Sequence, residues 1–381
     1  MTDESRFDDI RPYRDAEIPA AMKRIAGHRS FPMLANFIFP ERTVDEVREL
    51  VCSFKSVYDF QYHVMAAASQ RIIDCTTDGL TIDGVEKLDT SKHYLFVSNH
   101  RDIVLDSCLL MLSLYKCHGL DSGEITFGSN LMQGQLLIDI GKSNKMFRVE
   151  RAGSPREMYN SSIHLSEYIR YVLTERKQSV WIAQRNGRTK DGIDRTAQGI
   201  IKMFSMSGSG DRVSRLAELN IVPVSVSYEW EPCDMLKACE LYETARNGQY
   251  VKKPGEDLNS ILTGITQDKG RLHFQICDPV TAADLEAFGQ IPDVRFHRCV
   301  AELIDRRICG GYHLFPNAYI AYDMRYGTSR YNAEYSADQA AAFKARLDGL
   351  SGFGTDDMDA LRDIFLGIYC NPIACPCVQT V

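Results

Sequence analysis

VSNHRDIVLD, at residues 97–106, joins a predicted strand to a predicted helix. The run Tyr94–Val97 is apolar and rich in strand-forming residues. The run from Asp106 to Tyr115 is apolar enough for a buried helix. In α/β sheets, the residues that follow the carboxyl end of a strand face the crevice where ligands bind. We therefore expect a ligand site close to His100.

Strands and helices alternate on both sides of this junction. Leu80–Ile82, Val180–Ala183 and Ile221–Val226 have the pattern of short buried strands. The pair Ser154-Pro155 predicts a helix start, because serine caps a helix and proline fits its first turn. This alternation predicts a layered α/β domain over residues 79–325, with a mainly β central sheet flanked by helices.

The two ends of the chain have helical patterns. Apolar residues recur at three- and four-residue steps from Val44 to about Asp74, which predicts one long amphipathic helix with a core-facing side. Ser336–Leu347 and Asp356–Tyr369 are also predicted to be helical. We therefore expect a helical region at residues 1–78 and a helical extension at residues 326–381.

Composition and charge exclude several classes of protein. The chain has 381 residues, with 44 basic and 51 acidic side chains and a formal net charge of −7. It therefore lacks the bulk positive charge of a nucleic-acid-binding protein. No apolar run approaches the roughly 20 residues that cross a bilayer, and the acidic start MTDESRFDDIRP lacks the pattern of a secretory signal. We expect a cytoplasmic protein with reduced cysteines.

The cysteines do not predict a metal site. None of the twelve forms a CxxC pair. Cys370, Cys375 and Cys377 cluster near the end of the chain, but no histidine lies within forty residues of them. We expect neither a bound metal ion nor a resident cofactor.

His100 is the strongest candidate for catalysis. An imidazole titrates near neutral pH and can take a proton from a hydroxyl group. A neighbouring carboxylate fixes its tautomer and stabilises its charged form. Asp102 and Asp106 are both close enough in the sequence to do so. The alternative is a structural histidine in a polar network, and spacing alone does not separate the two.

Two basic segments and one proline are further candidates. Lys142, Lys145, Arg148 and Arg151 fall within ten residues, where a solvated surface is the ordinary explanation. Residues 184–195 follow a predicted strand and hold four cations and two glycines. This composition suits a phosphate site, because glycine lets the backbone approach and arginine grips two oxygens. Pro223 interrupts an apolar strand, and its missing N–H predicts an edge strand or a bulge.

The order of these features resembles the glycerophospholipid acyltransferase family, which includes glycerol-3-phosphate and 1-acylglycerol-3-phosphate acyltransferases. Four blocks carry the resemblance: Asn99-His100 with a following aspartate, Phe147 to Arg151, the turn at residues 186–188, and the apolar strand around Pro223. It covers about residues 79–230. The segment SYEWEPCD at residues 227–234 also looks like a cytosolic bacterial branch without transmembrane spans.

The resemblance implies a layered αβ acyltransferase domain and a role for each matched residue. His100 would be the general base and Asp106 its partner. Arg151 would hold the phosphate of the acceptor, and Gly187 and Arg188 would lie at the phosphate or acyl-donor site. The implied substrate-binding set is completed by Asn99, Phe147, Asn186 and Pro223.

Two positions depart from the family pattern. The family places four residues between the histidine and the aspartate, whereas five separate His100 from Asp106. Asp102 therefore stays open as the alternative partner. Asn186 stands where the family has glutamate, and an asparagine keeps a hydrogen-bonding carbonyl but loses the charge. This second departure leaves room for an inactive relative.

The resemblance implies direct transfer of an acyl group from acyl-CoA or acyl-carrier protein, as co-substrate, to a hydroxyl of a glycerol phosphate or lysophospholipid-type acceptor. A non-catalytic phospholipid-binding protein and a thioester or lipid hydrolase are the alternatives.

Because such products are membrane lipids, we also expect peripheral attachment to the inner face of a membrane. The candidate segment is Phe31–Phe39, which lies near Lys23, Arg24, Arg29 and Arg42 in the sequence. Core packing is the other explanation for this apolar segment.

Overall fold

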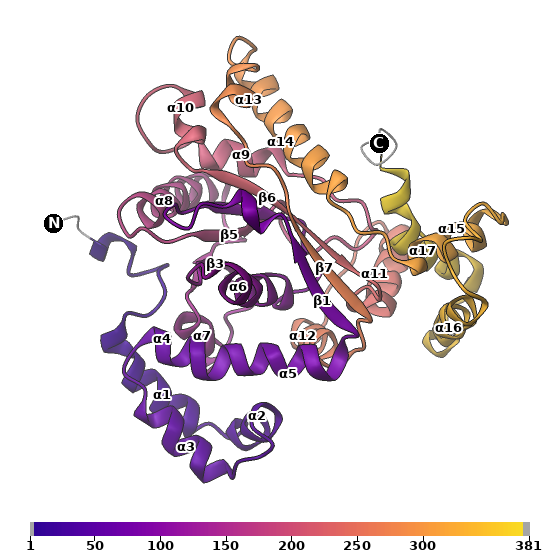
Figure 1. The fold of residues 1–381 in the computed structure, drawn as a ribbon, viewed down its shortest axis with the longest axis horizontal. Coiled ribbons are helices and arrows are strands. Elements are labelled where there is room, and N and C mark those ends of the chain that lie inside the picture. The colour runs from indigo at the N-terminus through magenta and orange to yellow at the C-terminus, as the bar shows by residue number, and fades with distance from the viewer. Residues whose placement is uncertain (1–3, 376–381) are drawn as a thin grey trace.

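The computed structural model describes residues 4–375, in which a seven-stranded sheet lies between layers of helices (Figure 1). The strand order is β1-β7-β6-β2-β5-β3-β4, and every neighbouring pair is parallel except β6 with β7. The strands are β1 (Gly79–Asp83), β2 (Leu95–Ser98), β3 (Glu124–Gly128), β4 (Met146–Val149), β5 (Val180–Ala183), β6 (Ile221–Tyr228) and β7 (Arg271–Ile276). The expected α/β fold is confirmed.

Helices surround the sheet and form both ends of the described chain. Their bounds are α1 (Ile18–Ala26), α2 (Phe31–Ile38), α3 (Val44–Ser53), α4 (Val57–Phe60), α5 (Ala66–Thr76), α6 (Leu105–His118), α7 (Gln135–Ser143), α8 (Pro155–Thr174), α9 (Gln198–Phe204), α10 (Arg212–Ala217), α11 (Asp234–Asn247), α12 (Glu256–Thr266), α13 (Ala282–Glu286), α14 (Asp293–Gly310), α15 (Pro316–Tyr326), α16 (Ala337–Asp348) and α17 (Met358–Cys370). Among residues 4–375, no helix has both the length and the apolar character needed to span a bilayer.

The central strand β2 packs on both of its faces. Leu95 and Val97 belong to a core with α8, α9 and α14, whereas Phe96 belongs to a core with α5, α6 and α12. All four residues of β2 are buried, as expected for a parallel strand covered by helices on both sides. The two layers of helices are visible above and below the sheet in Figure 1.

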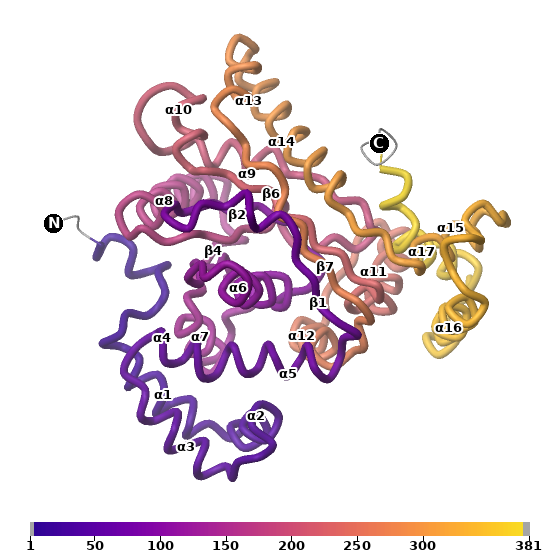
Figure 2. Tube along the Cα trace, viewed as in Figure 1, coloured from indigo at the N-terminus to yellow at the C-terminus, as the bar shows by residue number. Residues whose placement is uncertain are grey.

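The helical ends lie on different sides of the sheet (Figure 2), and each has an apolar cluster of its own. In the N-terminal region, α1 to α4 share a cluster that includes Ile18, Phe31 and Phe60. Near the other end, α15, α16 and α17 pack with α11 around Phe343 and Phe365. Because α11 and α12 lie between β6 and β7 in the chain, this insertion connects the C-terminal helices to the sheet.

The prediction of one long helix from Val44 to Asp74 is wrong. The chain leaves helical geometry after α3, and Ser56 then caps α4: its hydroxyl accepts the N–H of Asp59 at 3.1 Å. The Asp59 carboxylate accepts the N–H of Ser56 at 2.9 Å in return. A π-helical segment, Gln61–Met65, then leads into α5. The apolar residues keep their three- and four-residue spacing across this break, so the spacing alone did not indicate that a new helix is capped at Ser56.

The predicted start of α8 is confirmed. The Ser154 hydroxyl accepts the N–H of Glu157 at 3.3 Å, and the Glu157 carboxylate accepts the N–H of Ser154 at 2.7 Å. Pro155 occupies the first helical position, where no intrahelical N–H bond is lost.

The prediction that Pro223 marks an edge or bulge is wrong. β6 lies inside the sheet, and Pro223 is in regular parallel register with Val97 of β2. On the other side, the N–H of Cys277 donates to the Pro223 carbonyl at 3.0 Å. The missing proline donor therefore faces Cys277, just beyond the end of β7, so no bond to β2 is lost.

Candidate active site

His100 lies in the loop between β2 and α6, at the carboxyl end of a central strand. Its Nδ1 is 2.8 Å from Oδ2 of Asp106, and the side chain is only 10% exposed. The Trp181 ring meets the imidazole edge to face, with 5.5 Å between ring centroids. Within the described chain, Nε2 makes no hydrogen bond. The ring is therefore fixed through one nitrogen and leaves the other for chemistry.

Asp106 is held by four donors. Oδ2 accepts from His100 and from the backbone N–H groups of Arg101 at 2.6 Å and Asp102 at 2.9 Å. Oδ1 accepts from the Tyr228 hydroxyl at 2.8 Å. Burial and the nearby Asp106 carboxylate raise the pKa of Tyr228 well above its ordinary value, so this hydroxyl keeps its proton and continues to donate.

Asp102, the alternative partner, does not bond to His100. Its Oδ1 accepts the backbone N–H groups of Val104 and Leu105, both at 2.9 Å, at the start of α6. Its Oδ2 is buried without a hydrogen-bond partner. Because His100 precedes α6, the loop at residues 101–104 takes up the extra residue and Asp106 still reaches the ring.

Five of the predicted site residues line one pocket of about 310 Å³: His100, Arg151, Asn186, Gly187 and Arg188. The pocket is also lined by loop residues beside them and by the insertion between β6 and β7. These further residues are Ile103, Asn130, Leu131, Arg185, Lys190, Asp191, Glu240, Leu241, Thr244, Lys252 and Asp257. The fold thus brings together, beside the candidate base, segments that are distant in the sequence.

Three arginines of this pocket have no carboxylate in ion-pair distance. Across residues 4–375, Arg151, Arg185 and Arg188 form no salt bridge, and Nη1 of Arg188 is buried without a hydrogen-bond partner. Burial lowers the pKa of Arg151, against the opposing effect of Asp257. Arg151 packs so closely on Gly128 that a Cβ there would lie 2.5 Å from its Nε. These guanidinium groups suit an anionic ligand.

Three predicted substrate-binding residues do not line the pocket. The Asn99 amide is buried and ties β2 to its surroundings, donating to Asp194 and to the Val226 carbonyl, each at 3.0 Å. Phe147 is fully buried against the Tyr168 ring, with 5.1 Å between centroids. Pro223 lies inside the sheet. The structure gives all three a packing or bonding role instead.

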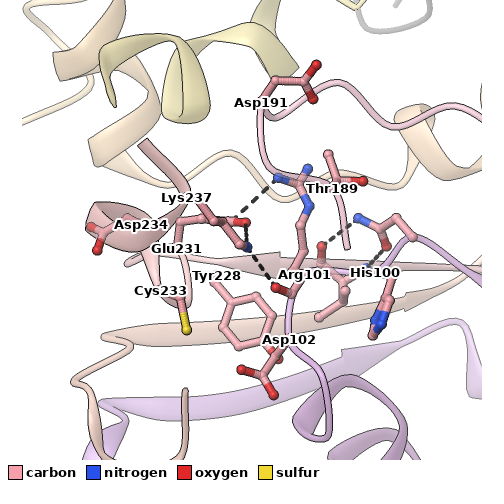
Figure 3. A network of polar contacts seen from close by, with 12 residues as sticks. His100, Arg101, Asp102, Thr189, Asp191, Tyr228, Glu231, Cys233, Asp234 and Lys237 are labelled. Atoms are coloured by element: carbon pink, nitrogen blue, oxygen red, sulfur yellow. Dashed lines mark hydrogen bonds and ion pairs between the residues drawn. The ribbon is translucent and has the colours of Figure 1, made fainter. Parts of the chain in front are cut away.

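A buried charged network supports the loop of His100 (Figure 3). Arg101 lies 2.6 Å from Asp194 and 3.5 Å from Glu231. Lys237 lies 2.7 Å from Glu231 and also donates to the Arg101 carbonyl at 2.7 Å. Although burial alone would raise the pKa of Asp194, the Arg101 guanidinium lowers it. Removing one partner from such a buried network costs about 3–5 kcal/mol.

The backbone of residues 184–189 runs directly beside His100. The N–H of Gln184 donates to the Ser98 carbonyl at 2.8 Å, and the N–H of Thr189 donates to the His100 carbonyl at 2.7 Å. The Thr189 hydroxyl also donates to Asp194 at 2.5 Å. These bonds fix residues 186–188 next to the candidate base.

The sequence did not reveal Tyr228, the partners of Arg101, or the pocket residues of the insertion. Arg101 is 93 residues from Asp194 and 130 from Glu231, so no local pattern connects them. Tyr228 had a usable signal, because it is a polar aromatic residue two positions beyond the predicted strand Ile221–Val226, and the observed strand ends at it.

No family model and no curated protein matches the chain. Among solved structures, it is similar to the 1-acyl-sn-glycerophosphate (LPA) acyltransferase PlsC from Thermotoga maritima, at 12% sequence identity and a TM-score of 0.37, over 76% of this chain and 93% of that one. A likeness of this degree identifies neither a family nor an activity.

Proposed function

We propose that the chain is an O-acyltransferase that moves a fatty acyl group from an acyl thioester to a hydroxyl of a phosphate-bearing acceptor. The observation that carries this proposal is the His100–Asp106 pair at the wall of a pocket with three arginines that lack carboxylate partners among residues 4–375. The donor is acyl-CoA or acyl-carrier protein, and the acceptor belongs to the glycerol phosphate or lysophospholipid type.

The hydrogen bond to Asp106 supports the role of general base for His100. When Nδ1–H donates to the carboxylate, the lone pair of neutral imidazole is on Nε2. Nε2 takes the proton from the acceptor hydroxyl as its oxygen attacks the thioester carbonyl. The new C–O bond forms, the C–S bond breaks, and the imidazolium returns the proton to the departing thiolate. Asp106 stabilises the imidazolium between these steps.

The arginines account for the choice of acceptor. Arg151 and Arg188 would bind its phosphate and hold its hydroxyl beside Nε2, which replaces a bimolecular encounter with a fixed geometry. Asn186 is uncharged, so it adds a hydrogen-bonding amide to this wall without opposing the phosphate. A hydrolase would use the same histidine with water as the acceptor. A phosphate site next to the base favours transfer, because water needs no such site.

Product analysis tests the proposal. The purified protein is incubated with labelled acyl-CoA or acyl-carrier protein and a panel of acceptors, and the products are identified by mass spectrometry. We expect an acylated acceptor in excess of free fatty acid. Free fatty acid alone would indicate a hydrolase, and binding of lysophospholipid without thioester turnover would indicate a non-catalytic binding protein.

Attachment to a membrane through α2 is part of the proposal. Phe31 and Phe39 are buried, so the apolar segment contributes to the core, whereas Met33 is 60% and Phe37 36% exposed. Of the nearby cations, Arg24 is already paired with Asp139 at 2.7 Å. The exposed pair on α2 would therefore make the apolar contact with the lipid.

Sedimentation with vesicles tests this attachment. Vesicles that contain anionic lipid should pull down the wild-type protein and much less of the Phe37→Asp variant. Equal sedimentation of the two proteins would rule out α2 as the attachment site, provided that both unfold at the same urea concentration.

A further inference from the structure

One carboxylate of the pocket forms no ion pair with any of residues 4–375. Glu240 is paired with Lys190, and Asp257 is paired with Lys252. Asp191 also lines the pocket, but over residues 4–375 it forms no salt bridge. Its Oδ1 accepts only the N–H of Ile193, at 3.0 Å, within its own turn. Among the described residues, the pocket therefore has charges of both signs that form no ion pair: three arginines and one aspartate.

The backbone at Asp191 is fixed by the C-terminal part of the described chain. Nδ2 of Asn371 donates to the Asp191 carbonyl at 2.7 Å. Asn371 is itself held by Arg325, whose Nη1 donates to its side-chain oxygen at 3.1 Å. Asp191 therefore has a defined position at the pocket wall, on the loop that also carries Thr189 (Figure 3).

Gly192, the residue after Asp191, packs directly against α17. Gly192 has φ of +75°, which favours glycine, and a Cβ there would lie 2.2 Å from the Ile368 carbonyl oxygen. The loop consequently presses directly on the end of α17. This close packing fixes the backbone of the loop that carries Asp191.

From this distribution of charge we propose that the acceptor is zwitterionic: it carries a protonated amine as well as a phosphate, and Asp191 binds the amine. This inference rests on the proposed function, because it names the acceptor of the same reaction. The arginines take the phosphate and the unpaired aspartate takes the ammonium group. An acceptor with a phosphate alone leaves the Asp191 charge unmatched, and its own negative charge is repelled by that carboxylate.

Matched acceptors test the inference. We compare lysophosphatidylethanolamine with lysophosphatidylglycerol of the same acyl chain, since the two headgroups are of similar size and only the first has an ammonium group. The measured quantity is kcat/KM for acylation with one fixed thioester donor. A charge-assisted hydrogen bond corresponds to roughly a 10- to 100-fold preference for the amine-bearing acceptor.

Variants of Asp191 assign the preference to this side chain. In Asp191→Asn the ratio of the two kcat/KM values should fall at least tenfold, and in Asp191→Glu, which keeps the charge, most of the ratio should remain. Both kcat/KM values are measured on the same protein sample. A smaller fraction of folded enzyme therefore lowers both equally and leaves their ratio unchanged. A wild-type ratio near one, or an unchanged ratio in Asp191→Asn, would overturn the inference and leave the proposed function standing. If neither acceptor is acylated and the thioester is not consumed, both proposals fail.

Discussion

Replacing Asp106 with asparagine separates the charge of this carboxylate from its hydrogen-bonding geometry. Its Oδ2 accepts the N–H groups of Arg101 and Asp102 as well as the His100 ring. Backbone N–H groups can only donate, so the amide oxygen of the variant must occupy the Oδ2 position. The amide nitrogen then faces Tyr228, whose hydroxyl can rotate and accept. His100 consequently keeps its tautomer.

The size of the effect follows from what each variant removes. Asp106→Asn loses only the charge that stabilises the imidazolium, so we expect kcat to fall about 100-fold, at the lower end of what general-base catalysis supplies. We expect its free energy of unfolding to change by about 1 kcal/mol or less. Asp106→Ala instead leaves three buried donors of Arg101, Asp102 and Tyr228 without an acceptor. At about 1–3 kcal/mol for each unsatisfied group, it should lose about 3 kcal/mol or more.

Two measurements check this reasoning. Single-turnover acyl transfer at saturating acceptor gives the rate of the chemical step, and urea denaturation gives the free energy of unfolding. A loss of about 10⁴-fold in Asp106→Asn with unchanged stability would mean that the amide nitrogen faces the imidazole and imposes the wrong tautomer. A loss below threefold would mean that the Asp106 charge takes no part in the reaction.

Two further predictions concern the phosphate site and the pH dependence of stability. Arg188→Ala should raise KM at least tenfold for a phosphate-bearing acceptor and much less for an uncharged alcohol; steady-state kinetics with both acceptors measures this, and an equal rise for the two would contradict a phosphate contact. Burial lowers the pKa of Lys269 from 10.5 to about 8, so between these values the unfolded chain binds more protons than the folded one. The free energy of unfolding should therefore rise with pH across that window and rise less in Lys269→Met, as urea titrations at pH 7.5 and 10 would show; identical slopes would refute it.

The sequence predicted those parts of the site that local pattern determines. His100 follows a strand whose composition is unambiguous, and residues 186–188 follow another; parallel strands bring these two loops to the same edge of the sheet. The sequence could not decide between Asp102 and Asp106, because both lie within reach of the ring. The difference arises from the start of α6, where the backbone N–H groups of Val104 and Leu105 engage Asp102.

The sequence could not show features that depend on contacts between distant segments. Pro223 suggested an edge strand because it has no N–H to donate. In the fold this missing donor faces Cys277, just beyond the end of β7, and the sequence does not show where β7 ends relative to Pro223. Phe147 and Asn99 do not line the pocket, because their side chains lie in the core and in a buried hydrogen-bond network. Asp191 and its contact with Asn371 join segments 180 residues apart, so only the folded chain shows it.

Acylation by the His100→Ala variant is the most direct test of the catalytic assignment. His164, a half-buried histidine 3.1 Å from Asp9 that does not line the pocket, provides the matched control. With a labelled acyl thioester and a phosphate-bearing acceptor, we expect His164→Ala to form product at the wild-type rate. We expect His100→Ala to form almost none, while its far-ultraviolet circular dichroism stays unchanged. Near-normal product formation by folded His100→Ala would contradict the assignment of this imidazole as the base.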